Sequence, residues 1–357
     1  MCAKSLVDKD EFFKILKGYK QKIWPIVEEH ISIKPIPTIS SLKMPEMEKF
    51  FWKQIADYPL RGGKYIRSAL VLMTCEALGG TCEDAVFTAA AMELSQNWIL
   101  IHDDVEDNSA KRRGKPTLHL RYSINHAINA GDGLHIIMWK VLSRNLERLD
   151  VDRCSLIWNE FYDMMLRTSA GQTAELALRN SLELTLDDVY YILDGKTGYY
   201  TVAGPMRLGA VIAGYDPRTA PELFQNINEF GLNLGRAFQI VDDLLDVTSD
   251  FEGLKELGSD IQEGKRSVLL VKLLQRADQF DLPRVLDIMN KPQGMRNSEE
   301  IRFIITLLDE YGIIEEARKL ANDLAENSRQ ILKKIPLKNN SAKVFDKFVQ
   351  YLVERTF

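Results

Sequence analysis

Two acidic segments of one pattern contain the side chains best suited to chemistry. Residues 103–107 read DDVED and residues 242–246 read DDLLD, and each segment ends a long stretch of helical apolar periodicity. Their outer acids are Asp103 with Asp107, and Asp242 with Asp246. Residues i and i+4 of an α-helix share a face, so each outer pair projects together, and such carboxylates repel one another unless a hard cation lies between them. Mg²⁺ completed by phosphate oxygens is the usual guest, so the pattern indicates a phosphate-bearing substrate.

One acidic pattern of this length would be weak evidence, because short motifs arise by chance and acidic clusters are usually a solvated helix face. The surroundings favour function instead. Residues 98–101 (WILI) and 237–241 (AFQIV) precede the two segments and read as core. Charges rarely occur beside such sequence without a partner.

The composition excludes some classes of protein. The chain has 357 residues, with 45% hydrophobic and 27% charged residues, as in an ordinary globular protein large enough for a substantial core. Its formal net charge of -5 argues against a non-specific nucleic-acid binder. Any anionic substrate must therefore be met by basic groups that are gathered locally.

The sequence also predicts a compartment. Residues 1–10 contain early acids and no apolar run, so neither a secretory signal nor a transit peptide is expected. No clean run of about 18 apolar residues is present to span a bilayer. The four cysteines, Cys2, Cys75, Cys82 and Cys154, lack zinc-ligand spacing and disulfide density, so we expect buried free thiols. A cytoplasmic protein without a membrane span is predicted.

Helical periodicity runs along the whole chain, with a proline-containing loop at 33–45. No βαβ rhythm and no strands bounded by hairpin turns are expected. The spacing predicts helices at 10–31, 45–59, 65–78, 83–105, 117–130, 134–149, 153–179, 197–212, 221–247, 267–277, 298–311, 314–333 and 342–355. The connections are mostly short, so we predict an all-α bundle, a single domain over 1–357, with a central active-site cavity inside the core.

Two basic segments are suited to binding anions. In residues 61–67 (RGGKYIR), paired glycines free the backbone, and Lys64 and Arg67 at a helix start can converge on one anion. Residues 111–117 (KRRGKPT) follow the first acidic segment and are expected to form a flexible loop that could fold back over the metals. Arginine suits diphosphate because its planar fork donates two bonds at once. Taken alone, each segment could equally be an ordinary turn or a solvated loop.

Taken together, these motifs resemble the trans-prenyltransferases of the polyprenyl synthetase family, and most of all the short-chain farnesyl and geranylgeranyl diphosphate synthases. The motifs extend over about residues 60 to 270 and stand in family order. They are the two acidic segments and residues 62–64 (GGK), 112–117 (RRGKPT), 171–176 (GQTAEL), 196–198 (KTG), 238–239 (FQ) and 258–265 (GSDIQEGK).

The resemblance implies a metal centre of three Mg²⁺ ions. Asp103 and Asp107 would ligate two ions and Asp242 the third. The metal centre would also include Asp104, Asp243 and Asp246, which would support it by hydrogen bonds or through water.

The resemblance also implies two substrate pockets. The residues that would bind the allylic diphosphate are Arg112, Lys196 and Lys265. Those matching the pocket for isopentenyl diphosphate are Lys64, Arg67, Arg113 and Gln96. Gly63 and Asp260 complete the substrate-binding set, while the carbonyl of Thr197 and the amide of Gln239 would face a carbocation. Lys196, Thr197, Gln239 and Lys265 are thus the expected catalytic residues.

The implied chemistry is ionisation, condensation and elimination, assisted by Mg²⁺. No dedicated protein base is expected, in keeping with the lack of a Ser-His-Asp or Cys-His arrangement. His102 beside the first acidic segment is expected to pack or to support a neighbour. A homodimer is implied by the family.

Product length is expected to depend on Trp98, five residues before Asp103. The growing chain in this family runs beside the helix of the first acidic segment, and an indole there should stop growth early, while Ile99 leaves more room than a second aromatic residue. We expect a C20 product, geranylgeranyl diphosphate, with C15 farnesyl diphosphate as the alternative.

The chain departs from the family pattern at a few positions. Tyr65 and Ser68 replace the Arg and Pro common in the glycine motif. The tail, residues 354–357 (ERTF), lacks several basic residues, which leaves its part in covering isopentenyl diphosphate open.

Three other functions compete with this hypothesis. A class I terpene cyclase also ionises allylic diphosphates, but it needs no second diphosphate pocket and has Asn and Ser or Thr in its second metal motif. A non-catalytic regulatory subunit would not need both acidic segments and Lys196. A di-iron carboxylate bundle requires Glu-x-x-His pairs that the sequence lacks.

Overall fold

The structure is a computed structural model that describes residues 2–32, 48–179, 181, 183–248, 257–338 and 341–353, with side chains from Glu11 onward. The predicted loop at 33–45 and the tail at 354–357 lie outside the described residues. No described helix is long and apolar enough to cross a membrane.

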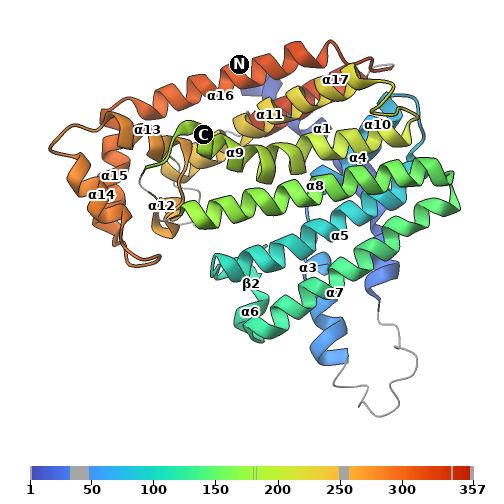
Figure 1. The fold of residues 1–357 in the computed structure, drawn as a ribbon, viewed down its shortest axis with the longest axis horizontal. Helices are drawn as coiled ribbons and strands as arrows, with labels where there is room; N and C mark the ends of the chain where they lie inside the picture. Colours follow the sequence, from blue (N-terminus) through green and yellow to red (C-terminus); the bar gives the residue numbers. More distant parts are fainter. Residues whose placement is uncertain are drawn as a thin grey trace. The chain divides into compact units, whose positions relative to one another are not determined.

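The predicted all-α class is confirmed, since helices make up most of the described chain (Figure 1). The chain divides into two compact units. The first comprises residues 1–159 and 205–219, and the second comprises residues 160–204 and 220–357. Helices α8 (Val151–Leu178) and α10 (Gly204–Ile212) each begin in one unit and continue in the other.

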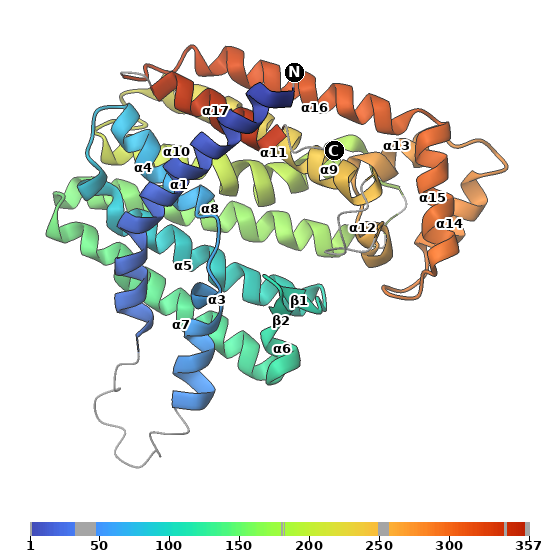
Figure 2. The ribbon, with the colours of Figure 1, turned by 180° about the vertical axis from the view of Figure 1, so that it is seen from behind.

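The first unit is built around one long helix. Its elements are α1 (Cys2–Ile31), the π-helix η1 (Glu48–Trp52), α3 (Lys53–Leu60), α4 (Ile66–Ala77), α5 (Cys82–Glu106), β1 (Lys111–Arg112), β2 (Lys115–Pro116), α6 (Leu118–Arg121), α7 (Ile124–Ser143) and the 3₁₀-helix η2 (Arg144–Glu147). Thr81 caps α5 by accepting a 3.2 Å hydrogen bond from the Asp84 amide. The middle of α5 is fully buried at Ala89, Ala90 and Ala91. Helix α5 packs along α7, as Figures 1 and 2 both show.

The predicted helices at 117–130 and 134–149 are wrong in their division. The chain breaks at Tyr122 and Ser123, and one helix, α7, then runs through the two glycines where a break was expected. A Cβ on Gly131 would lie 2.3 Å from His102 Nε2, and one on Gly133 would lie 2.6 Å from Ile55 Cδ1. These glycines therefore let neighbouring side chains pack against α7, which outweighs their low helix propensity.

The expected absence of strands is also wrong, because β1 and β2 form a two-stranded antiparallel hairpin. Arg113 and Gly114 form its turn with positive φ angles of 51° and 74°. Consecutive left-handed residues match the twist of a tight hairpin. The basic segment at 111–117 is thus a defined hairpin where a flexible loop was expected.

The second unit packs around α11 (Pro221–Thr248), which lies along α16 (Ile313–Leu332) in both views (Figures 1 and 2). Its other elements are α9 (Leu186–Leu193), the π-helix η3 (Asp194–Ala203), α12 (Ser259–Glu263), α13 (Val268–Arg276), α14 (Leu282–Met289), α15 (Ser298–Glu310) and α17 (Ser341–Val353). The long helices lie where they were predicted, whereas the short α9, α12 and α14 were missed.

The predicted helix at 197–212 is wrong in its first part. Residues 194–203 form a π-helix, and α-helix begins only at Gly204. Helix α9 before it begins with a capping box in which Thr185 and Asp188 bond reciprocally. The thiols of Cys75, Cys82 and Cys154 are free and buried, as predicted, and Cys2 lies where side chains are not described.

Candidate active site

The predicted site residues are distributed over both units. The first unit contains Gly63, Lys64, Arg67, Gln96, Trp98, Ile99, Asp103, Asp104, Asp107, Arg112 and Arg113. The second unit contains Lys196, Thr197, Gln239, Asp242, Asp243, Asp246, Asp260 and Lys265.

The first acidic segment forms the last turn of α5. The amide of Asp107 donates to the carbonyl of Asp103 over 2.8 Å, so the two residues lie one helical turn apart. Asp103 is half-buried and Asp107 is 7% exposed. This placement is the one the spacing predicts for two acids on one face.

Asp104 makes contacts of a different kind. Its carboxylate is buried and accepts hydrogen bonds from Tyr58 Oη at 2.5 Å, from Arg112 Nε at 2.9 Å and from Arg112 Nη2 at 2.5 Å. Burial and the Asp104 bond raise the pKa of Tyr58, so the phenol stays a donor. Burial lowers the pKa of Arg112, but the bond to Asp104 and the charges of Asp104 and Asp103 together outweigh burial and raise the pKa overall. Asp104 therefore fixes a cation beside Asp103.

Arg61, at the C-terminal end of α3, anchors the hairpin that carries Arg112. Arg61 was not among the predicted site residues. Its guanidinium donates to the carbonyl oxygens of Arg112 at 2.9 Å and Pro116 at 2.8 Å. Asp57 accepts from Arg61 Nε at 2.5 Å, and the guanidinium stacks on the Tyr58 ring with a centroid distance of 4.4 Å. The basic segment is therefore anchored, whereas a flexible loop was predicted.

Arg113 lies at the glycine turn. It donates to the Tyr58 carbonyl at 2.8 Å and to Asn97 Oδ1 at 2.9 Å. A Cβ on Gly63 would lie 3.0 Å from Arg113 Nη2 and 3.4 Å from Glu93 Oε1. Glycine at 63 therefore allows the guanidinium to approach the turn.

The buried acid beside this turn, Glu93, was also missed. It is 4% exposed and accepts from Ser68 Oγ at 2.9 Å. Burial raises its pKa, opposed by the Ser68 bond and by the charges of Arg113 and Arg67. A charged residue in the middle of the most apolar helical stretch was the available signal. Ser68, one of the departures from the family pattern, has a partner here.

The other residues predicted to bind isopentenyl diphosphate lie in the glycine segment, at the start of α4 and on α5. Lys64 is exposed, while Arg67 and Gln96 are half-buried. Gln96 Oε1 is a buried atom without a hydrogen-bond partner among the described residues. Lys20 of α1 reaches the Gly63 carbonyl at 3.4 Å, so a helix distant in sequence contributes a cation.

In the second unit, Lys196 and Thr197 lie on the π-helix η3. Lys196 Nζ pairs with Glu175 Oε2 at 2.9 Å. A Cβ on Gly171 would lie 2.8 Å from the Lys196 amide nitrogen, and one on Gly235 would lie 2.2 Å from Gly198 Cα. These glycines let α8 and α11 contact the backbone of η3 directly. The GQTAEL segment thus supplies both a close approach and an acid for Lys196.

The start of η3 is fastened to α11 by Arg236. Its Nε donates to Asp194 Oδ1 at 2.6 Å and its Nη2 to Oδ2 at 2.5 Å. The guanidinium also lies 4.5 Å from the centroid of the Tyr190 ring. A bidentate pair of this kind fixes both direction and distance.

The second acidic segment ends α11. Asp242 is half-buried, whereas Asp243 and Asp246 are buried. Asp243 Oδ1 accepts from Gln239 Nε2 at 2.9 Å, and burial together with the charges of Asp260 and Asp242 raises the pKa of Asp243. Thr197 Oγ1 lies 3.4 Å from Gln239 Oε1, so both ends of that amide are held.

Asp246 and Asp260 connect this segment to α12. Asp246 accepts from Ser259 Oγ at 2.6 Å and from the Asp260 amide at 3.0 Å. Lys265 Nζ pairs with Asp260 Oδ1 and Glu263 Oε2, both at 2.9 Å. Burial lowers the pKa of Lys265, but the charges of Asp260 and Glu263 outweigh it and hold that pKa well above its usual range. The predicted Lys265 and Asp260 are thus brought together.

Trp98 belongs to an aromatic cluster of the first unit. Its indole stacks on His135 of α7, with ring centroids 4.2 Å apart and an interplanar angle of 7°. His135 Nε2 accepts from Trp139 Nε1 at 2.8 Å, and burial lowers the pKa of His135. Ile99 follows on α5 and is half-buried. His102 Nε2 lies 3.1 Å from the Ile128 carbonyl oxygen, and whether His102 packs or supports a neighbour stays a prediction.

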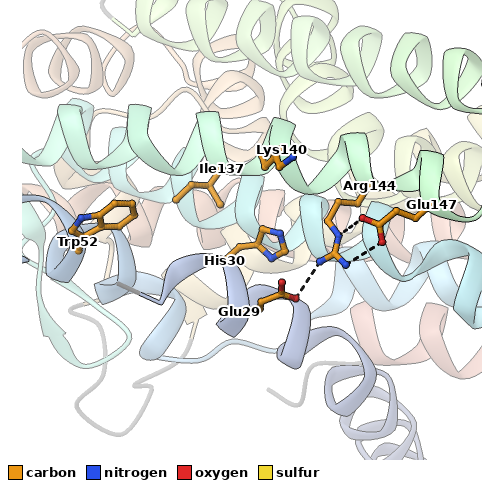
Figure 3. A pocket seen from close by; sticks show the side chains of 7 residues that line it. All are labelled: Glu29, His30, Trp52, Ile137, Lys140, Arg144 and Glu147. Carbon is orange, nitrogen blue, oxygen red and sulfur yellow. Dashed lines mark hydrogen bonds and ion pairs between the residues drawn. The ribbon is translucent and has the colours of Figure 1, made fainter. Parts of the chain in front are cut away.

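A cavity elsewhere in the first unit contains none of the predicted residues. Its volume is about 410 Å³. Arg144 pairs with Glu29 at 3.1 Å and with Glu147 at 2.8 Å. Figure 3 marks both ion pairs with dashed lines. The lining consists of Glu29, His30, Trp52, Ile137, Lys140, Arg144 and Glu147. Since Arg144 already has two acid partners, the rim does not present it to an anion.

The donors of the acidic segments suit Mg²⁺. No group of three or more His, Cys, Asp or Glu side chains that could enclose a metal was found in the described part of the chain. Mg²⁺ takes one or two carboxylates, and phosphate oxygens and water supply its other ligands. Paired aspartates one turn apart match this requirement, whereas a closed protein cage would not.

These features define a helical protein with two aspartate-rich segments, each with a basic side chain in an ion pair nearby. The model of the polyprenyl synthetase family matches residues 50–308, and the chain belongs to this family.

Relatives and solved structures agree with this membership. The chain is 34% identical over 272 residues to a short chain isoprenyl diphosphate synthase of Methanothermobacter thermautotrophicus, covering 76% of this chain and 80% of the relative. It is 29% identical over 296 residues to a geranylgeranyl diphosphate synthase of Saccharolobus solfataricus, covering 83% and 86%. The structure is similar to that of a geranylgeranyl pyrophosphate synthetase from Pyrococcus horikoshii, with a TM-score of 0.85, 28% identity, and coverage of 97% and 99%.

Proposed function

We propose that the protein is a chain-elongating isoprenyl diphosphate synthase. It condenses isopentenyl diphosphate with allylic diphosphates of five to fifteen carbons and forms geranylgeranyl diphosphate. Family membership and the names of several relatives support the enzyme class and this product.

One observation carries the proposal: the two acidic segments divide their acids in the same way. The second acid of each, Asp104 or Asp243, is buried and hydrogen-bonded to a neighbouring polar side chain. The first acid of each, Asp103 or Asp242, is half-buried. Such a repeated arrangement is expected if both segments bind the same type of ligand. In each segment the buried second acid orients a polar side chain next to the first acid.

Mg²⁺, when bound, stabilises the negative charge that develops on the departing pyrophosphate. Asp103, Asp107 and Asp242 are the residues that would hold it, with Asp104, Asp243 and Asp246 in support. A centre of three ions stays part of the proposal.

The cationic side chains bind the allylic diphosphate. Arg112 is pre-oriented by its two bonds to Asp104, so it loses little side-chain entropy when it meets a diphosphate. Lys196 and Lys265 hold acids, Glu175 and Asp260, at 2.9 Å. Each ion pair places an ammonium group where a diphosphate, the stronger partner, can take the place of the acid.

The carbon chemistry then needs oxygen dipoles without a nucleophile. The allylic carbon–oxygen bond breaks and pyrophosphate leaves with the electron pair. The double bond of isopentenyl diphosphate supplies the electrons of the new carbon–carbon bond, and the resulting cation loses a proton to pyrophosphate. The carbonyl of Thr197 and the amide of Gln239 are the dipoles that favour the cation.

The second pocket distinguishes this reaction from that of a class I terpene cyclase. Arg113, Lys64, Arg67, Gln96 and Gly63 are assigned to isopentenyl diphosphate. The half-buried Arg113, oriented by Asn97 and the Tyr58 carbonyl, favours this assignment, because a cyclase has no second diphosphate to bind. A non-catalytic subunit would need neither pocket.

Product length is assigned to Trp98 and Ile99. An indole stacked on His135 is less free to swing aside than an isolated one. This supports an early stop to chain growth. Farnesyl diphosphate is the alternative product, and analysis of chain length separates the two.

We also propose that the protein is a homodimer, that each chain forms a single domain with a central active-site cavity, and that the protein is cytoplasmic. The homodimer has support in α7, where Ile124, Ile128 and Ile136 are 55%, 41% and 70% exposed at intervals of one or two helical turns. Such a row is suited to a second copy of the chain. Sedimentation velocity of the purified protein at micromolar concentration tests it, and a monomer would contradict it.

The experiment for the proposed function uses purified protein with Mg²⁺ and isopentenyl diphosphate. We expect consumption of isopentenyl diphosphate only when an allylic diphosphate of five, ten or fifteen carbons is added. Absence of turnover with every one of these primers would contradict the enzyme assignment.

A further inference from the structure

Two arginines of the second unit are buried, and the charge of Glu300 acts on one of them, Arg296, without forming an ion pair with it. Arg266 is 6% exposed and Arg296 is 5% exposed, and neither forms an ion pair with any of the described acids. Their guanidinium groups donate to backbone carbonyl oxygens instead. Burying such a charge is unfavourable unless hydrogen bonds replace its water. Two like charges buried close together are therefore unfavourable, and a functional role would explain them.

Arg296 connects the end of α12 to the end of α14. It donates to the carbonyl oxygens of Gln262 at 3.0 Å, Ile288 at 3.1 Å, Met289 at 2.8 Å and Lys291 at 2.7 Å. The last carbonyls of a helix lack intrahelical partners and carry partial negative charge. A planar fork with five donors can satisfy several of them at once, which a lysine cannot.

Arg266 connects the residues after α12 to Ser181 and to the end of α14. It donates to the carbonyl oxygens of Ser181 at 2.9 Å, Gly264 at 3.1 Å and Met289 at 3.4 Å, so it shares Met289 with Arg296. Burial and the charge of Arg296 lower the pKa of Arg266 to about 10. Arg266 still carries its charge at neutral pH.

Lys265 lies between the residues that these arginines hold. Gly264 before it has a φ of +82°, and a Cβ there would lie 3.2 Å from Arg296 Nη2. The Lys265 amide donates to the Asp260 carbonyl at 2.9 Å, and its ammonium pairs with Asp260 Oδ1 at 2.9 Å. The backbone just before Lys265 is therefore held by two buried cations, with Arg296 bound to the Gln262 carbonyl and Arg266 to the Gly264 carbonyl.

We propose that Arg296 is a positioning residue for Lys265 and Asp260. It does not touch substrate. It acts through the carbonyl of Gln262 and its packing against Gly264, which set the direction in which the Lys265 ammonium leaves the backbone. This inference rests on the proposed function, in which Lys265 meets the allylic diphosphate. It adds a residue that lies 31 positions beyond Lys265 in the sequence.

The first test compares substrates. A small displacement of a binding group can change activity by up to a hundredfold, so we expect Arg296→Met to raise the KM for the allylic diphosphate about tenfold. The KM for isopentenyl diphosphate should stay within about twofold, because its pocket residues lie elsewhere. Arg284→Met is the matched control: Arg284 lies on α14, is exposed, and its guanidinium lies 3.9 Å from the centroid of the Phe303 ring. It should leave both KM values unchanged.

The second test is a double-mutant cycle with Lys265→Met. If Arg296 acts through Lys265, adding Arg296→Met to Lys265→Met should change the allylic KM by less than about twofold. Independent tenfold losses in both backgrounds would overturn the proposal, as would equal rises in both KM values for Arg296→Met alone. Arg296→Lys gives the same readouts should the methionine variant fail to fold. A wild-type protein without any prenyl transfer would contradict the proposed function instead.

Discussion

The Asp104 carboxylate holds the Arg112 guanidinium by two hydrogen bonds, 2.9 Å from Nε and 2.5 Å from Nη2, while Tyr58 donates to it at 2.5 Å. This contact distinguishes Asp104 from the outer acids of the DDVED segment, Asp103 and Asp107. Asp103 lies one residue away, and its Oδ2 atom is 3.7 Å from Arg112 Nη2. The segment therefore holds a cationic side chain and, in the proposal, a metal ion within one helical turn.

Substitution of the two neighbouring acids should have different consequences. Asp103→Asn is expected to raise the Mg²⁺ concentration needed for half-maximal activity about tenfold or more, because it removes a metal ligand. Asp104→Asn should lower the free energy of unfolding by about 2 kcal/mol, because it weakens charge-assisted bonds to Arg112, and should shift the Mg²⁺ dependence much less than Asp103→Asn does. Magnesium titrations and denaturant unfolding of both variants measure these effects. An equal shift in Mg²⁺ dependence for both would assign Asp104 to the metal.

Glu93 should make the stability of the protein depend on pH. Burial raises the pKa of Glu93 above the value of about 4.3 that a free glutamate has. Below that value Glu93 is protonated in both the folded and the unfolded states. As the pH rises above it, the unfolded state releases its proton first, so Glu93 makes the free energy of unfolding fall. The loss is complete once the pH passes the raised pKa of the folded state.

Glu93→Gln should therefore stabilise the protein more at pH 7.5 than at pH 4.5. Thermal unfolding of both proteins across this range measures the difference. The KM for isopentenyl diphosphate should rise in the variant, because Arg113 loses a nearby negative charge. A gain in melting temperature that is the same at both pH values would show that the Glu93 carboxyl has no raised pKa.

The π-helix η3 depends on close backbone contacts with α11. Gly235→Ala would bring a Cβ to 2.2 Å from Gly198 Cα, so the backbone must shift. We expect a loss of about 1–3 kcal/mol in the free energy of unfolding and a marked loss of kcat, because Lys196 and Thr197 move with η3. Denaturant unfolding and steady-state kinetics measure both.

Gly18→Ala is the matched control for this substitution. Gly18 lies on α1 with no atom within 4 Å of a Cβ placed on it. The change should raise the free energy of unfolding by up to about 1 kcal/mol through helix propensity and leave kcat unchanged. Full activity in Gly235→Ala would mean that η3 tolerates displacement.

The aromatic cluster gives a prediction about product length. Trp98→Ala should lengthen the product by one or more five-carbon units, because the indole that is stacked on His135 is the proposed barrier. Trp158→Ala is the control. Trp158 lies in the same cluster, 5.2 Å from Trp139 between ring centroids, but on α8 and 41% exposed. Mass spectrometry of the products compares the two, and an unchanged product from Trp98→Ala would remove Trp98 from this role.

The sequence predicts most of the helices because apolar periodicity fixes long helices such as α5 and α11. It fails where tertiary contacts outweigh propensity. Gly131 and Gly133 read as a helix break, but they allow His102 and Ile55 to pack against an unbroken α7. The π-helix η3 was missed for a similar reason. A helix was predicted only from residue 197, because the sequence does not show that α8 contacts Gly195 and that α11 contacts Gly198.

Among the site residues, those that would touch substrate follow from motifs, and those that position them do not. Asp103 and Arg112 stand in recognisable segments. Glu93 and Arg296 are single charged residues whose meaning depends on burial, which the sequence does not state. The hairpin at 111–117 shows the same limit: its basic residues were found, but its rigidity comes from Arg61 at the end of α3.

The central claim is that the chain transfers an allylic group to isopentenyl diphosphate. Its most direct test is a product assay of the purified protein with Mg²⁺, radiolabelled isopentenyl diphosphate and farnesyl diphosphate, with reversed-phase separation of the dephosphorylated products. We predict geranylgeraniol as the main labelled alcohol, and none when farnesyl diphosphate or Mg²⁺ is omitted. No labelled prenyl alcohol with dimethylallyl, geranyl or farnesyl diphosphate as primer would contradict the account.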